Sequence, residues 1–188
     1  MVKVVASKIP NKKFWDKRKV FITGHTSFKG TWLKLWLEHL GSKVYGLSKN
    51  YPSFPNNLYQ KIYKKNNEVG SILNYKELQK KISKSNSDIA FHFAAQSIVS
   101  EASKMPIDTY KTNILGTATF LESCLKAKKV KLAVIITTDK CYDDNFGKNY
   151  FKEESILGGS EPYSASKACA EILSKSYVNK FKKKQKKI

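Results

Sequence analysis

The sequence contains no apolar run long enough to cross a lipid bilayer. Its first residues, 1–13, lack the apolar segment of a secretion signal, so we expect a cytoplasmic protein with no membrane partner. Only three cysteines occur, Cys124, Cys141 and Cys169, and their spacing suits neither a disulfide framework nor a metal site. These absences disfavour membrane proteins, disulfide-rich secreted proteins and zinc proteins.

Arginine is almost missing as well, because Arg18 is the only arginine among 35 basic residues. The formal net charge of +20 taken alone suggests nucleic-acid binding. Phosphate and base recognition, however, favours the planar fork of arginine, and the lysines are spread over the expected helix surfaces. We therefore expect no nucleic-acid partner, and tight duplex binding with a steep salt dependence would be needed to reverse this interpretation.

The length of 188 residues suits one domain with a real core. Apolar and β-branched runs predict strands over 19–23, 43–47, 68–72, 88–93 and 131–137. Helical periodicity predicts helices over 32–40, 75–85, 107–128 and 162–181. This alternation predicts an α/β fold with a doubly wound parallel sheet of the Rossmann type. We expect an N-terminal arm over 1–16, the domain over 17–181 and a frayed, solvated basic tail over 182–188.

A glycine turn follows the first predicted strand, with Gly24 and Gly30 six residues apart and a helix immediately after them. Such a turn lets backbone N–H groups and the positive helix end approach a pyrophosphate closely. The alternative is an ordinary glycine turn before a helix, since the spacing is looser than the usual fingerprint. Among the histidines only His25, in this turn, has a plausible ligand role. We expect His92 in the core and His39 on a helix surface.

Tyr163 and Lys167 lie one helical turn apart, so their side chains share a helix face. A lysine beside a phenol stabilises the phenolate and lowers its pKa, which suits proton transfer near neutrality. The same spacing recurs at Tyr45 and Lys49, so the pattern alone is weak. What favours Tyr163 is its place after a strand that ends in two threonines, 137 and 138.

Asp139 and Lys140 follow the same strand end. They are a candidate acid and base pair. The alternative is an exposed ion pair in a loop, which is common and contributes little.

Together these segments resemble the extended short-chain dehydrogenase/reductases. The resemblance rests on the stretches 24–30, 94–96, 137–142 and 158–171 and on Asn113, and it covers about 14–180. Within that family the chain is most similar to the CDP-glucose 4,6-dehydratases. Their distinguishing features are the turn over 24–30 and the Asp139–Lys140 pair, where the related dTDP-glucose enzymes carry Asp-Glu.

The resemblance implies NAD as cofactor, CDP-glucose as substrate, no metal and a homo-oligomer in full-length members. It implies lyase activity in nucleotide-sugar metabolism, which supplies deoxysugars for surface polysaccharide and lipopolysaccharide. The residues implied to bind the cofactor are Gly24, His25, Thr26, Ser27, Phe28, Lys29, Gly30, Ala94, Ala95, Gln96, Asn113, Thr137, Tyr163 and Lys167.

The resemblance also implies the catalytic roles. Tyr163, assisted by Lys167 and Thr138, would remove the C4 hydroxyl proton while NAD takes the C4 hydride. Lys140 would remove the C5 proton, Asp139 would protonate the departing C6 hydroxyl, and hydride would return to C6. Lys140 must be neutral for part of the time, which needs burial or a cationic neighbour.

Several positions depart from the family pattern. Ser27 replaces the middle glycine of the turn, and Ser71 and Asn74 replace aspartates after the third strand. The second strand ends in residues 48–50, Ser-Lys-Asn, which offer no carboxylate for the ribose, so NAD and NADP both remain open on the residues alone.

The family continues for about as many residues again, so we expect a chain truncated before its C-terminal substrate domain. A non-catalytic NAD-binding fragment and another nucleotide-sugar epimerase or dehydratase are the alternatives.

Overall fold

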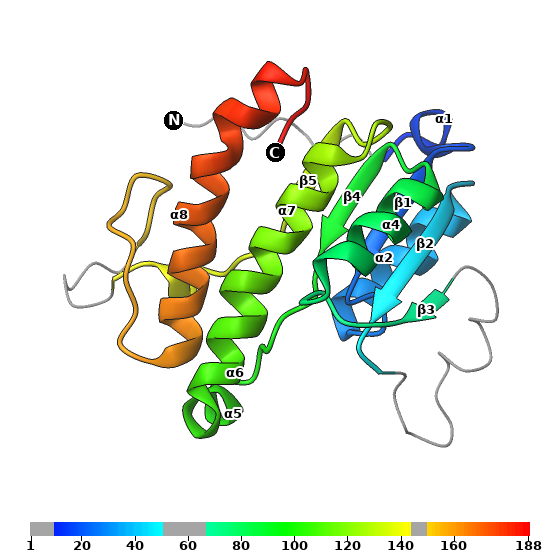
Figure 1. Ribbon diagram of the computed structural model, residues 1–188. Helices are drawn as coiled ribbons and strands as arrows, with labels where there is room; N and C mark the ends of the chain where they lie inside the picture. The colour runs from blue at the N-terminus through cyan, green and yellow to red at the C-terminus, as the bar shows by residue number, and fades with distance from the viewer. Residues whose placement is uncertain (1–9, 51–66, 144–149) are drawn as a thin grey trace.

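The computed structural model describes residues 10–50, 67–143 and 150–188, so residues 1–9 of the expected N-terminal arm lie outside the described part. A single parallel sheet organises it, in the order β3-β2-β1-β4-β5 (Figure 1). The strands are β1 (Lys19–Thr23), β2 (Lys43–Ser48), β3 (Asn67–Val69), β4 (Ile89–His92) and β5 (Leu132–Ile135). Strands β2 and β3 are added on one side of β1, and strands β4 and β5 are added on its other side. This switch of side, in a sheet whose strands are all parallel, confirms the doubly wound fold.

The helices occupy most of the expected positions. They are α1 (Lys12–Trp15), α2 (Phe28–His39), α4 (Tyr75–Ser85), α5 (Val99–Lys104), α6 (Pro106–Tyr110), α7 (Gly116–Lys126) and α8 (Pro162–Lys183). A π-helical turn, Lys111–Leu115, joins α6 to α7, and a 3-10 turn, Asp139–Cys141, follows β5. The single helix expected over 107–128 is therefore three consecutive helical segments, because the π turn interrupts the α-helical pattern.

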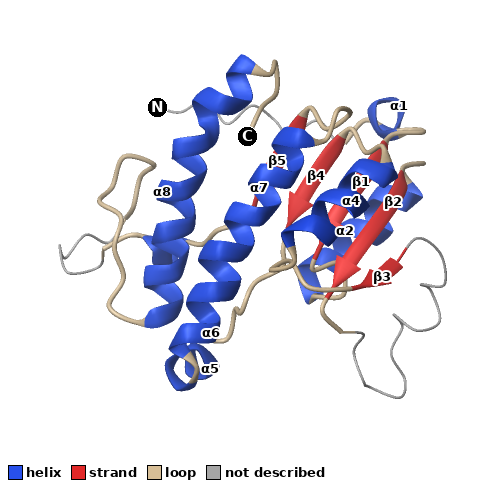
Figure 2. Cartoon of the chain, in the orientation of Figure 1, coloured by secondary structure: helices blue, strands red, loops and turns tan. Residues whose placement is uncertain are grey.

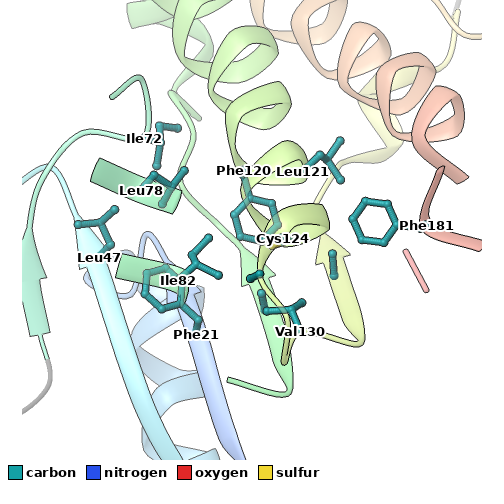
Figure 3. Packing of buried hydrophobic residues seen from close by; sticks show 13 residues of the cluster. Phe21, Leu47, Ile72, Leu78, Ile82, Phe120, Leu121, Cys124, Val130 and Phe181 are labelled. Atoms are coloured by element: carbon teal, nitrogen blue, oxygen red, sulfur yellow. The ribbon is translucent and has the colours of Figure 1, made fainter. Parts of the chain in front are cut away.

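One face of the sheet is covered by α4, α7 and α8, and α7 and α8 run side by side (Figure 2). Their apolar side chains meet those of the strands in one cluster, in which Phe120 of α7 and Ile82 of α4 are fully buried (Figure 3). Burying a side chain such as Phe120 contributes about 2–3 kcal/mol. This cluster is the main core of the domain.

The other face carries alternate side chains of the same strands, as the two-residue period of a strand requires. Val20, Ile22 and Val44 pack there against Leu37 of α2. Trp32 and Trp36 of α2, by contrast, remain 60% and 50% exposed. The apolar positions of α2 thus form a buried row and an exposed row.

The basic tail is ordered, so the expectation of a frayed, solvated tail is wrong. Lys187 pairs in parallel with Leu132 of β5, donating its N–H to Lys131 and accepting from Ala133. The buried Lys186 donates from Nζ to the carbonyls of Cys124, Leu125 and Ala127 at the end of α7. The tail therefore caps a helix and adds the first rung of a sixth strand.

Within the described residues, no helix has both the length and the apolar character to span a membrane.

Candidate functional site

The turn after β1 has the geometry expected of the glycine pattern. Gly24 has φ +73°, and a Cβ there would lie 2.6 Å from the backbone nitrogen of Ala94. A Cβ at Gly30 would lie 2.3 Å from the Gly24 carbonyl oxygen. Ser27 caps α2 by accepting from the Gly30 N–H at 3.2 Å. The expected order of strand, tight turn and helix is therefore confirmed.

A cleft of about 330 Å³ opens at the carboxyl ends of β1, β2, β3 and β4. Its walls combine backbone of the turn with small, polar and apolar side chains. They are Gly24, Thr26, Ser27, Ser48, Lys49, Asn50, Gly70, Ser71, Ile72, Leu73, Phe93, Ala94, Ala95 and Thr112. A cleft at the strand reversal, beside the positive N-terminus of α2, fits a dinucleotide pyrophosphate. The residues present therefore suit the cofactor implied by the sequence.

Five of the residues expected to bind the cofactor line this cleft: Gly24, Thr26, Ser27, Ala94 and Ala95. Gly30 lies behind the turn, whereas Phe28 is 81% exposed and Lys29 is exposed on the first turn of α2. Thr112, Phe93, Ile72 and Leu73 line the cleft but were not expected from the sequence. Only their proximity to strand ends or to Asn113 could have indicated them.

The His25 ring is fully buried beneath the turn and does not reach the cleft surface. Its Nδ1 lies 2.9 Å from Ser48 Oγ, at the end of β2. Burial lowers the pKa of His25 to about 4, so the ring is neutral at physiological pH. Gly46 makes room for it, because a Cβ there would lie 2.3 Å from the ring. The side chain of His25 thus supports the turn from below.

Asn113 sits in the π-helical turn and is 1% exposed. Its Oδ1 accepts from the Gln96 N–H at 2.8 Å, and its Nδ2 donates to the Gln96 carbonyl at 2.9 Å. Nδ2 also donates to Ser166 Oγ of α8 at 2.8 Å. Asn113 therefore fixes the segment after β4 against α8, and π turns of this kind recur at functional sites.

Tyr163 and Lys167, on the first two turns of α8, face the end of β5. The Lys167 ammonium donates to the Ile136 carbonyl at 2.8 Å, and the Thr138 side chain hydrogen-bonds the Tyr163 phenol. Burial raises the pKa of Tyr163, and the bond to Thr138 acts in the opposite direction. Lys167 was expected to lower this pKa, but the net pKa of Tyr163 is raised, because burial outweighs the hydrogen bond to Thr138. Burial also lowers the pKa of Lys167 itself.

The start of α8 is fixed by Glu161, which the sequence reasoning did not single out. Its carboxylate accepts from the N–H groups of Tyr163 at 2.7 Å and Ser164 at 2.8 Å. Burial raises the pKa of Glu161, but these hydrogen bonds outweigh it and the net pKa is lowered. An acidic residue directly before a proline at a helix start is a capping signal that could have indicated this role. The cap also orients Tyr163, because the phenol belongs to the first helical turn.

Asp139 and Lys140 lie in the 3-10 turn after β5 and line a second cleft of about 250 Å³ with Glu161 and Ser164. Both side chains are exposed. Thr138 donates to Asp139 Oδ1 at 3.0 Å. The structure thus brings both residues next to the Tyr163 helix start, but it does not bury Lys140.

Thr137 is expected among the cofactor ligands, and its hydroxyl donates to the Glu171 carboxylate of α8. Within the described ranges, no group of three or more His, Cys, Asp or Glu residues could hold a metal ion.

Comparison with known proteins identifies relatives of the whole described domain. The family model of GDP-mannose 4,6 dehydratase matches residues 21–185. The CDP-glucose 4,6-dehydratase of Salmonella typhimurium is 39% identical over 175 residues, which cover 91% of this chain and 48% of that protein. The dTDP-D-glucose 4,6-dehydratase of Dictyostelium discoideum is 37% identical over 180 residues, covering 88% of this chain and 41% of that protein.

A solved structure shows the same fold. The dTDP-glucose 4,6-dehydratase of Bacillus anthracis, crystallised in complex with NAD, superposes with a TM-score of 0.71 at 27% identity. The match covers 88% of this chain and 52% of that one. The chain therefore spans about half the length of the relatives it matches.

Proposed function

The chain belongs to the GDP-mannose 4,6 dehydratase family, and from this premise we propose that it serves the NAD-dependent dehydration of CDP-glucose to CDP-4-keto-6-deoxyglucose. One observation carries the proposal. The Tyr163–Lys167 helix start and the Asp139–Lys140 turn meet at the end of β5, on the same sheet edge as the dinucleotide cleft. In a doubly wound sheet this edge is where ligands bind.

The substrate rests on similarity. The relative from Salmonella typhimurium acts on CDP-glucose by its name. It shares 39% of its residues with this chain over the matched region. Because the chain matches about half of that protein, we propose that residues 17–181 form the dinucleotide-binding and proton-transfer domain of such an enzyme.

In the first stage, Tyr163 acts as a phenolate and takes the proton of the sugar C4 hydroxyl. Thr138 holds the phenol by a hydrogen bond, and Lys167 is held behind it by the Ile136 carbonyl. When bound, NAD would supply a hydride acceptor for C4 and the hydride that returns to C6. Thr26, Ser27 and the N-terminus of α2 hold the pyrophosphate.

In the second stage, Lys140 removes the proton at C5, which the C4 ketone has acidified, and Asp139 protonates the C6 hydroxyl as it leaves as water. When hydride adds to C6, the proton on Lys140 returns to C5. Lys140 must lose its own proton first, so its exposed side chain needs burial by the nucleotide sugar.

The proposal is tested with the chain completed by a C-terminal substrate domain, by incubating it with NAD and CDP-glucose and following the loss of water by mass spectrometry. We expect turnover that Tyr163→Phe lowers by about 10²–10⁴-fold, because the phenol proton carrier is lost. Tyr45→Phe is the matched control, since Tyr45 on β2 stands four residues before Lys49, the same spacing as Tyr163 and Lys167, and it should retain turnover within about twofold. Equal turnover in wild type and Tyr163→Phe would contradict the assigned role.

A second candidate function is favoured by the cleft at the carboxyl ends of β1 to β4, which lies wholly within the described residues. Under this alternative the chain binds NAD without converting CDP-glucose. Saturable NAD binding with no loss of water would select it.

We also propose a homo-oligomer in the cytoplasm. The three cysteines are free thiols, which accords with a reducing compartment.

A further inference from the structure

The end of β2 lacks the group that usually selects NAD. Dinucleotide sites of this fold place an acidic side chain at that position, where it accepts hydrogen bonds from the ribose hydroxyls. Here the cleft is lined at that position by Ser48, Lys49 and Asn50. None of the described residues that line the cleft is acidic.

Two hydrogen bonds hold this segment against the phosphate-binding turn. The Thr26 N–H donates to Ser48 Oγ at 3.2 Å, and Thr26 Oγ1 donates to the Asn50 carbonyl at 3.3 Å. Ser48 is 6% exposed, so its hydroxyl forms the cleft floor. Lys49 and Asn50 are exposed at its rim. The ribose nearest the turn would therefore meet a hydroxyl, an amide and an ammonium group.

The acidic residues of the neighbouring elements are already paired. Glu68 of β3 and Glu77 of α4 both contact the Lys81 ammonium, which lines a different cleft with Glu68. Lys49 makes no ion pair with a described residue. Its charge is thus available to a ligand anion at the cleft rim.

We propose that this cleft accepts NADP as well as NAD, with Lys49 as the partner of the 2′-phosphate. A carboxylate at the end of β2 would repel that phosphate, whereas Lys49 attracts it and Asn50 carries no charge. The inference rests on the proposed function in one respect, namely that the cleft takes a dinucleotide.

The test is the dissociation constant of the 188-residue chain for NAD⁺ and for NADP⁺, measured separately by titration calorimetry. We expect the two constants to agree within about fivefold, since an exposed ion pair changes affinity by no more than that. Affinity for NADP⁺ should fall more steeply with added salt than affinity for NAD⁺.

Two variants assign the effect to Lys49. Lys49→Glu should weaken NADP⁺ binding by about tenfold, because the 2′-phosphate is repelled, and should not weaken NAD⁺ binding, because the new carboxylate can accept hydrogen bonds from the ribose hydroxyls. Lys43→Glu makes the same charge change at the opposite end of β2 and should affect both dinucleotides equally.

The outcomes separate the inference from the function on which it rests. Binding of NAD⁺ with NADP⁺ weaker by more than about 100-fold overturns the inference and leaves the proposed function intact. Equal loss of both dinucleotides in Lys49→Glu also overturns it. Binding of neither dinucleotide by the wild-type chain overturns the dinucleotide site itself. Comparable binding with a selective effect of Lys49→Glu supports the proposal.

Discussion

His92 lies inside the sheet and is 2% exposed. Its Nδ1 lies 2.7 Å from Thr23 Oγ1, and its ring stacks on Phe120 at 4.5 Å. Burial lowers the pKa of His92 to about 3, as it lowers that of His25 to about 4. Both rings are therefore neutral in the folded chain and bind protons only after it unfolds.

This linkage predicts acid sensitivity. Each of the two folded-state pKa values lies below the unfolded value of about 6.5, so the unfolded state binds more protons between pH 6.5 and about 4. The free energy of unfolding should fall by roughly 3 kcal/mol for each histidine as the pH drops through that window. Urea unfolding at a series of pH values measures it. His92→Gln should remove one of the two contributions.

His39→Gln on the exposed surface of α2 is the matched control substitution and should change the free energy of unfolding at neutral pH by less than about 0.5 kcal/mol. A wild-type stability that stays constant from pH 7 to pH 4 would contradict both pKa shifts.

At this scale the sequence predicted which residues gather, but not what each contacts. Tyr163 and Lys167 share a helix face because helical spacing alone requires it. The partner of Lys167 is the Ile136 carbonyl, and it depends on how α8 docks on β5, which no local pattern encodes. His25 was expected to contact a ligand, and its burial follows from the absence of a side chain at Gly46 on a different strand.

Among the elements, the C-terminal tail is the one whose structure differs most from what its composition suggests. A lysine-rich end suggests a solvated segment, yet Lys186 reaches three carbonyls that α7 leaves without intrahelical partners. Burial lowers the pKa of Lys186, and the three acceptors hold its ammonium. Charge counting could not have predicted this arrangement, because it requires the end of α8 to lie beside the end of α7.

The contacts of Lys186 in the tail give a testable prediction, and the neighbouring Lys187 serves as the control. Lys186→Ala should lower the free energy of unfolding by about 1–3 kcal/mol, because it leaves buried carbonyls without a donor. Lys187→Ala should cost less than about 0.5 kcal/mol, since Lys187 contributes its backbone to β5. Urea unfolding of the two variants measures the difference. Equal stability would show that the Lys186 contacts contribute nothing.

The π-helical turn is a second feature that periodicity missed. Apolar residues continue on one side through 107–128, so the pattern predicts an unbroken helix. The extra residue in the turn presents Asn113 toward Gln96 and Ser166. Only the three-dimensional position of those partners specifies it.

For the whole molecule, the two sheet faces are covered unequally. Helices α4, α7 and α8 cover one face, whereas α2 leaves Phe28, Trp32 and Trp36 exposed beside Phe93 in a shallow apolar depression. Alternation of strands and helices predicted the sheet, its parallel order and its ligand edge. It did not predict this asymmetry, because the period of α2 does not distinguish its buried row from its exposed row.

The exposed tryptophans of α2 predict that this face of the protein binds apolar dyes. The double variant Trp32→Gln with Trp36→Gln should bind less of an apolar dye such as anilinonaphthalene sulfonate, while unfolding free energy changes by less than about 1 kcal/mol. Leu37→Gln, the neighbouring buried position, should instead destabilise the fold by about 2–5 kcal/mol. Dye fluorescence and urea unfolding report the two effects. A large loss of stability in the double variant would mean that the tryptophans support the fold.

The pairing of Lys187 with Leu132 also has a practical consequence for anyone who handles this protein. Because the pairing is parallel, residues appended after Ile188 are directed along the edge of β5, toward Thr137 and the Asp139–Cys141 turn. A purification tag fused there would start within the sheet edge and extend toward that turn.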